Sequence, residues 1–213
     1  VKMHISKVII SNYRNFENFE IDLKPFTVLV GENNIGKSNI INAIGLVLSN
    51  EISFYKGRSL EIEDFNYNTI KKFKESIVNM PISDIRFPEV RVDIFLSDFY
   101  DNDEQLAVVS DWLLNDYKTA KLSYIYQNKN PRKELWLESV KNQITGLAVE
   151  EAIKRINFPI GDYEYSIIGG LNEKKVDTYF LKKIGMEILD ALRDAKSELS
   201  TEGTRKLLYK ILV

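Results

Sequence analysis

The stretch Phe26-Thr-Val-Leu-Val-Gly-Glu-Asn-Asn-Ile-Gly-Lys-Ser38 decides how this chain can fold. Its second half fits the phosphate-loop pattern G-x-x-x-x-G-K-[ST]. The fixed positions of that pattern are occupied by Gly31, Gly36, Lys37 and Ser38. The apolar run 26–30 before the loop predicts a buried strand, and apolar residues at helical spacing over 37–48 predict a helix after it. Strand, glycine loop and helix form the context in which this motif holds phosphate.

The residue types in this loop suggest how an anion would be held. Glycine lets the backbone turn sharply and present its N–H groups, and the helix N-terminus adds donors and a partial positive charge. Lys37 would reach the β- and γ-phosphates, and Ser38 is the expected hydroxyl ligand of Mg²⁺. Asn33 and Asn34 tolerate left-handed backbone geometry and suit a loop that curls round a phosphate. The alternative interpretation is a glycine-rich turn that caps an ordinary helix, with Lys37 in solvent.

Composition limits the classes of protein to consider. The chain has 213 residues, of which 44% are hydrophobic and 28% charged, as in ordinary globular domains. The net charge of −2 gives no basic excess, so any contact with DNA must come from a local patch. The lack of cysteine excludes disulfides and thiolate metal sites and fits a reducing cytoplasm, where we expect the protein to lie. No apolar run reaches the ~20 residues of a membrane span.

The spacing of apolar residues, together with glycine and proline breaks, predicts the remaining helices and strands. We expect strands at 4–11, 19–23 and 89–96, a hairpin made of 121–127 and 134–140, and helices at 104–115, 149–156 and 204–213. We expect an exposed lysine-rich segment at 70–79, an irregular segment at 157–172 and an ambiguous one at 182–195. Two short strands that pair before the phosphate loop predict an α/β fold with a mixed sheet.

Three other groups of residues are weaker candidates for a site. The acidic turn 98–104 could hold a metal, but a solvated loop that caps the next helix is the favoured interpretation. The only histidine, His4, is expected to be structural. Lysine and arginine near aromatic residues could contact nucleic-acid phosphates, although a solvated face is favoured for each. These basic candidates are Lys71, Lys72 and Lys74 beside Tyr67, and Lys129, Arg132 and Lys133 beside Trp136.

Four segments together resemble a known family. They are Asn12-Tyr-Arg-Asn-Phe16, the loop 31–39, the triplet Glu63-Asp64-Phe65 and Ala191-Leu-Arg-Asp194. They are similar to the N-terminal ATPase lobe of the SMC/RecF-type ABC ATPases. The closest resemblance is to the OLD (overcoming lysogenization defect) family of ATP-dependent endonucleases, which includes the nuclease subunit of Gabija anti-phage systems. Residues 1–48 carry most of the likeness, and residues 50–213 match it only loosely.

This resemblance implies a fold and a division of the chain. The fold is an ABC-type P-loop NTPase lobe with a mixed sheet beside an antiparallel β-subdomain. We expect residues 1–213 to be the N-terminal part of a longer ABC/AAA-like ATPase domain. Within it, 1–48 would be a core of three strands followed by the P-loop and a helix, 89–140 a β-rich subdomain and 172–213 a C-terminal helical segment.

The resemblance also implies ligands and partners. ATP with Mg²⁺ would be wrapped by Arg14, Asn15, Gly31, Glu32, Asn33, Asn34, Ile35, Gly36, Lys37, Ser38 and Asn39. Ser38 would ligate the metal, and a glutamine from a later loop, either Gln127 or Gln143, would join it. ATP would lie between two copies of the chain in a homodimer. DNA and a helicase or other defence-system subunit are the implied partners, and no membrane is implied.

Several family features do not occur in this sequence. We find no signature loop, no apolar strand that ends in Asp-Glu and no acidic nuclease cluster, so the catalytic residues stay unassigned. Three functions remain open: an ATP-dependent endonuclease, a RecF/SMC-like repair ATPase without nuclease activity, and a non-catalytic nucleotide-regulated module that binds DNA or protein. A small-molecule kinase is disfavoured by the paired strands before the loop.

Overall fold

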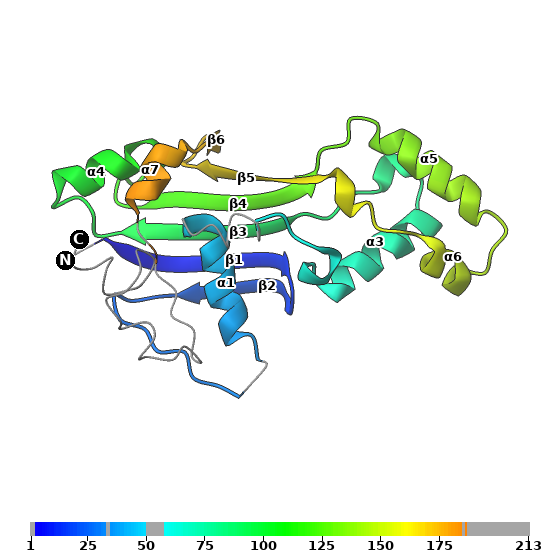
Figure 1. The fold of residues 1–213 in the computed structure, drawn as a ribbon, viewed down its shortest axis with the longest axis horizontal. Helices are drawn as coiled ribbons and strands as arrows, with labels where there is room; N and C mark the ends of the chain where they lie inside the picture. The colour runs from blue at the N-terminus through cyan, green and yellow to red at the C-terminus, as the bar shows by residue number, and fades with distance from the viewer. Residues whose placement is uncertain (1–2, 33–34, 50–57, 185, 187–213) are drawn as a thin grey trace, which may run out of the picture.

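A six-stranded sheet runs through the computed structural model, which describes residues 3–32, 35–49, 58–184 and 186 (Figure 1). The strands are β1 (His4–Tyr13), β2 (Phe16–Asp22), β3 (Val90–Ser97), β4 (Ala120–Asn128), β5 (Tyr163–Gly169) and β6 (Lys174–Lys175). Their order is β2-β1-β3-β4-β5-β6, and each neighbouring pair is antiparallel. The described part of the chain therefore contains an antiparallel sheet in place of the mixed sheet predicted from sequence.

The helices gather in three places around this sheet (Figure 1). They are α1 (Lys37–Leu48), α3 (Tyr67–Asn79), α4 (Asp103–Val109), α5 (Lys133–Ile144), α6 (Val149–Arg155) and α7 (Thr178–Lys183). Helix α1 crosses one face of the sheet and packs on β1, β3 and β4. Helices α3, α5 and α6 pack together beyond one end of the strands, whereas α4 and α7 meet near the other end.

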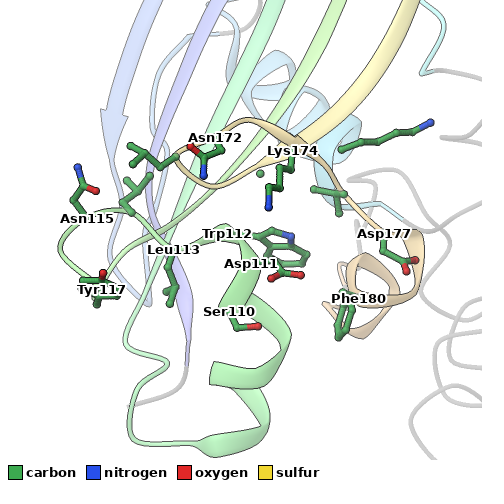
Figure 2. Close-up of a pocket in the computed structure, with 15 residues that line it drawn as sticks. Ser110, Asp111, Trp112, Leu113, Asn115, Tyr117, Asn172, Lys174, Asp177 and Phe180 are labelled. Atoms are coloured by element: carbon green, nitrogen blue, oxygen red, sulfur yellow. The ribbon is translucent and has the colours of Figure 1, made fainter.

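Short 3₁₀ turns connect several of these elements, at 62–64, 82–84, 110–112 and 160–162. The turn after α4, the β5–β6 connection and α7 border a cavity of about 430 Å³ (Figure 2). None of the helices within the described ranges is both long enough and apolar enough to cross a membrane.

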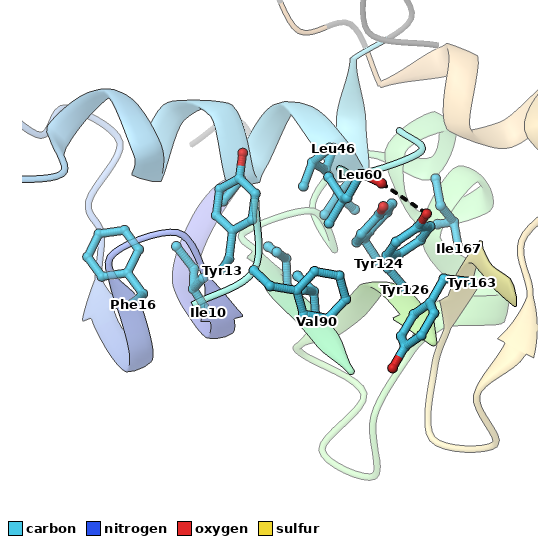
Figure 3. Close-up of a cluster of buried hydrophobic side chains, with 14 of the residues drawn as sticks. Ile10, Tyr13, Phe16, Leu46, Leu60, Val90, Tyr124, Tyr126, Tyr163 and Ile167 are labelled. Carbon is cyan, nitrogen blue, oxygen red and sulfur yellow. Dashed lines mark hydrogen bonds between the residues drawn. The ribbon is translucent and has the colours of Figure 1, made fainter. Parts of the chain in front are cut away.

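Alternation along the strands builds the core between the sheet and α1. The side chains on the α1 side of the sheet include Val8, Ile10, Val92, Ile94, Leu122, Tyr124 and Tyr126, and all of these are buried. The buried face of α1 consists of Ile40, Ala43, Ile44 and Val47, which recur at helical spacings of three and four residues. Burial of each large apolar side chain contributes about 1.5–3 kcal/mol, so this interface holds α1 on the sheet. Figure 3 shows part of this cluster.

Aromatic rings extend the core past the strand ends toward α3. The ring of Phe65 lies 5.4 Å from that of Tyr163 in an edge-on arrangement and 5.1 Å from that of Phe158. Such pairs add about 0.5–1.5 kcal/mol beyond their buried area. The hydroxyl of Tyr126 donates to the carbonyl of Leu60, which ties the segment before Phe65 to the sheet (Figure 3).

The strongest periodic signals in the sequence are confirmed. Helix α1 spans the predicted residues 37–48, and β1, β3 and β4 contain the predicted strands 4–11, 89–96 and 121–127, shifted by a residue at most. The predicted helix 149–156 corresponds to α6, and the predicted strand 19–23 overlaps β2. The predicted helix 104–115 is shorter, because α4 ends at Val109 and a 3₁₀ turn follows.

The predicted strand at 26–30 is wrong. These residues form no strand, and the side chains of Phe26, Val28 and Val30 are 84%, 65% and 89% exposed. An apolar segment becomes a strand only where a neighbouring strand accepts its backbone hydrogen bonds. In the part of the chain that the structure describes, no strand pairs with this one, although it leads directly into the glycine loop.

Three further sequence predictions are also corrected. Residues 134–140 belong to α5, not to a hairpin, because Leu137, Val140 and Ile144 bury one helical face. The segment 157–172, predicted to be irregular, contains β5. The lysine-rich segment 70–79 lies in α3: Lys71 and Lys72 are exposed as predicted, but the helix also buries Ile70, Phe73 and Ile77. The ambiguous segment at 182–195 lies mostly outside the described residues. The helix predicted at 204–213 and the Ala191–Asp194 segment lie wholly outside them.

Candidate functional site

The glycine loop meets the β1–β2 hairpin at the N-terminus of α1. Gly36 is the N-cap residue of α1, with φ of 112° and ψ of 7°. A Cβ atom added to Gly36 would lie 2.5 Å from Nδ2 of Asn15 and 2.9 Å from Cζ of Phe16. Real Cβ atoms do not approach this closely, and a positive φ disfavours other residues. Glycine at position 36 therefore allows the hairpin to pack against the loop.

The N-terminus of α1 offers backbone donors to an anion. The first backbone bond of the helix runs from the N–H of Ile40 to the carbonyl of Gly36 at 3.0 Å. No side chain among the described residues caps this end, and its first turn contains no acidic residue. The preceding N–H groups thus lack intrahelical acceptors, and the helix dipole adds a partial positive charge beside them.

Lys37 places a cation against the backbone that leads into the loop. Its Nζ donates to the carbonyl of Gly31 at 2.6 Å and to the carbonyl of Glu32. The side chain of Ser38, the next residue in the helix, is exposed. Asn33 and Asn34, which were predicted to curl round the phosphate, lie outside the described residues. A glycine-rich loop, an uncapped helix end and an ammonium bonded to the loop backbone fit the phosphates of a nucleotide, and the exposed Ser38 hydroxyl fits an accompanying Mg²⁺.

Arg14 and Asn15, predicted to lie near a nucleotide, both contact this region. The Nε of Arg14 donates to Oδ1 of Asp64 at 2.9 Å, and its Nη1 donates to Oδ1 of Asn39 at 3.0 Å. Nδ2 of Asn39 donates to Oδ1 of Asn15 at 2.7 Å, and Nδ2 of Asn15 donates to the carbonyl of Ile35 at 3.0 Å. The structure therefore brings the hairpin turn, the loop and the first turn of α1 together.

A second segment holds the hairpin in place. The N–H of Arg14 donates to the carbonyl of Asp64 at 2.7 Å, and the N–H of Asn66 donates to the carbonyl of Asn12 at 2.9 Å. Nδ2 of Asn66 also donates to the carbonyl of Arg14 at 2.9 Å. Arg14 has a φ of 48°, which costs a residue other than glycine about 1–2 kcal/mol. These bonds stabilise that conformation.

Asp64 and Asn66 were not predicted as site residues. The triplet Glu63-Asp64-Phe65 was a signal for them, but it carried no information about which residue Asp64 would contact. Arg14 and Asp64 are 50 positions apart, so no local pattern joins them.

Tyr13 lies buried beside Arg14, and this burial changes the pKa of its phenol. The guanidinium carbon lies 5.0 Å from the centre of the Tyr13 ring, within range of a cation–π contact. Burial raises the pKa of Tyr13 to about 12, an effect that the charge of Arg14 opposes and that of Asp64 reinforces. The phenol of Tyr13 therefore stays protonated and neutral near pH 7.

The other candidate residues lie elsewhere. Gln127 is on β4, on the opposite face to the core residue Tyr126, and Gln143 is exposed on α5; neither side chain bonds to the described residues of the loop. Nδ1 of His4 lies 3.4 Å from Oδ2 of Asp98. Within the described ranges, no group of three or more His, Asp or Glu side chains converges to hold a metal. Among the basic candidates, Lys72 pairs with Glu17.

The lining of the cavity in Figure 2 contains no residue of the glycine loop. It is lined by residues that include Trp112, Gly169, Lys174, Asp177 and Phe180. The strand pairing places Gly169 beside Leu122, at the start of β4, whereas the β1–β2 turn lies at the end of the sheet where β4 finishes. The candidate phosphate site is therefore an open surface at the N-terminus of α1 and does not include this cavity.

Comparison with known proteins places this geometry in context. Residues 3–210 match the family model described as AAA ATPase domain. A stretch of 58 residues is 47% identical to the DNA replication and repair protein RecF of Rickettsia canadensis (strain McKiel), covering 26% of this chain and 14% of that protein. A stretch of 50 residues is 46% identical to the Old nuclease of Escherichia phage P2, covering 24% of this chain and 8% of that protein. The matched stretches thus span a small fraction of these relatives.

Proposed function

Because this chain belongs to the AAA ATPase domain family, we propose that its glycine loop binds the phosphates of ATP together with Mg²⁺. One observation carries the proposal: the ammonium of Lys37 bonds to the carbonyls of Gly31 and Glu32, beside a helix N-terminus that no described side chain caps. The nucleotide would be wrapped by Arg14, Asn15, Gly31, Glu32, Asn33, Asn34, Ile35, Gly36, Lys37, Ser38 and Asn39.

Each group would have a distinct task at this site. Lys37 would exchange its carbonyl partners, Gly31 and Glu32, for phosphate oxygens, which form stronger, charge-assisted hydrogen bonds. The free N–H groups of the first turn of α1 would bind the same anion. The hydroxyl of Ser38 would ligate Mg²⁺, which supplies charge neutralisation between the β- and γ-phosphates when bound.

We propose further that the full-length protein hydrolyses ATP in order to drive or regulate DNA cleavage. The likeness to the phage P2 Old nuclease supports this proposal. In this function two copies would enclose the nucleotide, and a helicase or other defence subunit would be a partner. The likeness to RecF supports a second candidate, a DNA-repair ATPase without nuclease activity.

A cleavage assay with the full-length protein separates the two candidates. Plasmid DNA cut in the presence of ATP, but not with a non-hydrolysable analogue, supports the nuclease. ATP-dependent DNA binding and phosphate release without cutting support the repair ATPase. ATP binding without phosphate release would contradict both candidates and leave a nucleotide-regulated binding module.

Nucleotide binding itself is tested by titrating this chain with ATP and Mg²⁺ in a calorimeter. We expect Lys37→Ala to weaken binding at least ~10-fold, equivalent to ~1.4 kcal/mol, because the loop loses its cation. Lys174→Ala is the matched control, since Lys174 is exposed on β6 at the opposite end of the sheet and should bind ATP normally. Equal affinity of the Lys37→Ala variant and the wild type would refute the proposed site.

A further inference from the structure

A continuous series of hydrogen bonds runs from Asp64 to the backbone of the glycine loop. Asp64 accepts from Arg14 at 2.9 Å, and Arg14 donates to Asn39 at 3.0 Å. Asn39 donates to Asn15 at 2.7 Å, and Asn15 donates to the carbonyl of Ile35, next to Gly36, at 3.0 Å. We call this series of five residues the amide relay.

Within the amide relay, the chemistry of Arg14 and of the Ile35 carbonyl fixes the direction of every hydrogen bond between them. The guanidinium of Arg14 can only donate, and the carbonyl of Ile35 can only accept. Each asparagine between them must therefore accept through Oδ1 and donate through Nδ2. Rotating either amide by 180° would place donor against donor and acceptor against acceptor. The orientation of Arg14 thus determines how Asn39 and Asn15 hold the loop.

Asp64 is well placed to determine the orientation of Arg14. One carboxylate oxygen accepts from Arg14, and the other accepts from the backbone N–H of Glu61 at 3.2 Å. The side chains of Asp64 and Arg14 are only 22% and 35% exposed, which reduces screening of their attraction. The N–H of Arg14 also donates to the carbonyl of Asp64, so the backbone aligns the two side chains.

We propose that Asp64 is a positioning residue for the phosphate site: it acts through Arg14 and the amide relay to set the shape of the glycine loop for the phosphates. Among the described residues, the Asp64 side chain bonds to Arg14 and Glu61 and not to the loop itself. The inference rests on the proposed binding of ATP at this loop, and it adds a residue from a distant segment to the site. It also connects that segment, which precedes α3, to nucleotide affinity.

A double-mutant cycle on ATP affinity tests this role. We expect Asp64→Asn to weaken Mg·ATP binding by about 10-fold, and Arg14→Gln by a similar factor. Because Asp64 acts through Arg14, the double variant should bind no more weakly than Arg14→Gln alone. Losses that multiply in the double variant would overturn the proposal, as would unchanged affinity in Asp64→Asn.

Thr69→Val is the matched control. The hydroxyl of Thr69 donates to Oδ1 of Asn12 at 2.7 Å, so this variant also loses a polar contact with the hairpin but leaves the amide relay intact. We expect its ATP affinity to equal that of the wild type. A loss as large as that of Asp64→Asn would mean that general loosening of the hairpin explains both, and would overturn the proposal.

A spectroscopic readout separates failure of the relay from failure of the proposed function. In protein labelled with ¹⁵N-asparagine, the side-chain amide signals of Asn15 and Asn39 report their hydrogen bonds without any nucleotide. We expect both signals to shift in Asp64→Asn and to stay in place in Thr69→Val. Unshifted signals in Asp64→Asn overturn the relay. If the wild type fails to bind ATP, the proposed function is wrong, and these signals alone decide whether the relay exists.

Discussion

Substitution of Arg58 by methionine should destabilise the protein strongly, although the residue lies at the far end of α1 from the glycine loop. The side chain is 1% exposed. Its Nε donates to the carbonyl of Leu46 at 3.0 Å, and its Nη2 donates to the carbonyls of Val47 and Ser49 at 3.3 and 2.9 Å. These are carbonyls at the C-terminal end of α1, where a cation also interacts favourably with the helix dipole.

The magnitude follows from these contacts. Methionine retains much of the apolar stem, so the main loss is that of the hydrogen bonds. A hydrogen bond from a charged group contributes about 1.5–3 kcal/mol, and the two shorter bonds therefore give about 3–6 kcal/mol. With a urea m-value of about 2 kcal/mol/M, the unfolding midpoint should fall by about 1.5–3 M.

Urea unfolding monitored by circular dichroism measures this change. Arg86→Met is the control, because Arg86 also donates to backbone carbonyls, those of Ser83 and Ile85, but is exposed. Its loss should be below about 0.5 kcal/mol. If Arg58→Met lies within about 1 kcal/mol of Arg86→Met, buried capping of α1 is not a major source of stability.

Three other predictions test the surroundings of the loop. Gly36→Ala should lower the free energy of unfolding by about 2–3 kcal/mol and weaken ATP binding, because the alanine methyl group would clash with Asn15. The control is Gly146→Ala, which is also at positive φ (83°) but in open space and should lose only about 1 kcal/mol. The free energy of unfolding should fall by about 2–3 kcal/mol more in the wild type than in Tyr13→Phe between pH 10 and 12. The raised pKa of Tyr13 stabilises the folded state below pH 10, and that contribution is lost as the pH approaches 12; parallel pH profiles would contradict it. Asn66→Ala should cost about 1–2 kcal/mol by removing the side-chain cap of α3, and thermal unfolding unchanged from the wild type would show the cap to be dispensable.

Local chemistry was enough to predict α1 and the loop before it. Helical spacing and the glycine pattern are both contained within a dozen consecutive residues, so they need no knowledge of distant partners. The same holds for β3, where apolar and polar residues alternate from Val90 to Ser97. Arg14 and Asn15 were predicted through a resemblance, and the structure shows the contacts that place them at the loop.

The features that the sequence did not predict depend on residues that lie far away along the chain. The run 26–30 has the composition of a strand, yet a strand also needs a neighbour to pair with. The glycines and proline around β5 suggested irregular structure, but pairing with β4 over Leu122–Asn128 made it regular. Asp64 reaches the site only through its hydrogen bond with Arg14, and residues 50 positions apart form no local sequence pattern that could predict this contact.

The exposed apolar run 26–30 also has a consequence for the behaviour of the protein in solution. The side chains of Phe26, Val28 and Val30 are exposed, and no described strand pairs with this segment, so it can pair with a strand of another molecule. Pro25 protects only one end of it. We therefore expect concentrated solutions of this chain to scatter light and gain β-structure with time, and a lysine in place of Val28 to keep them clear.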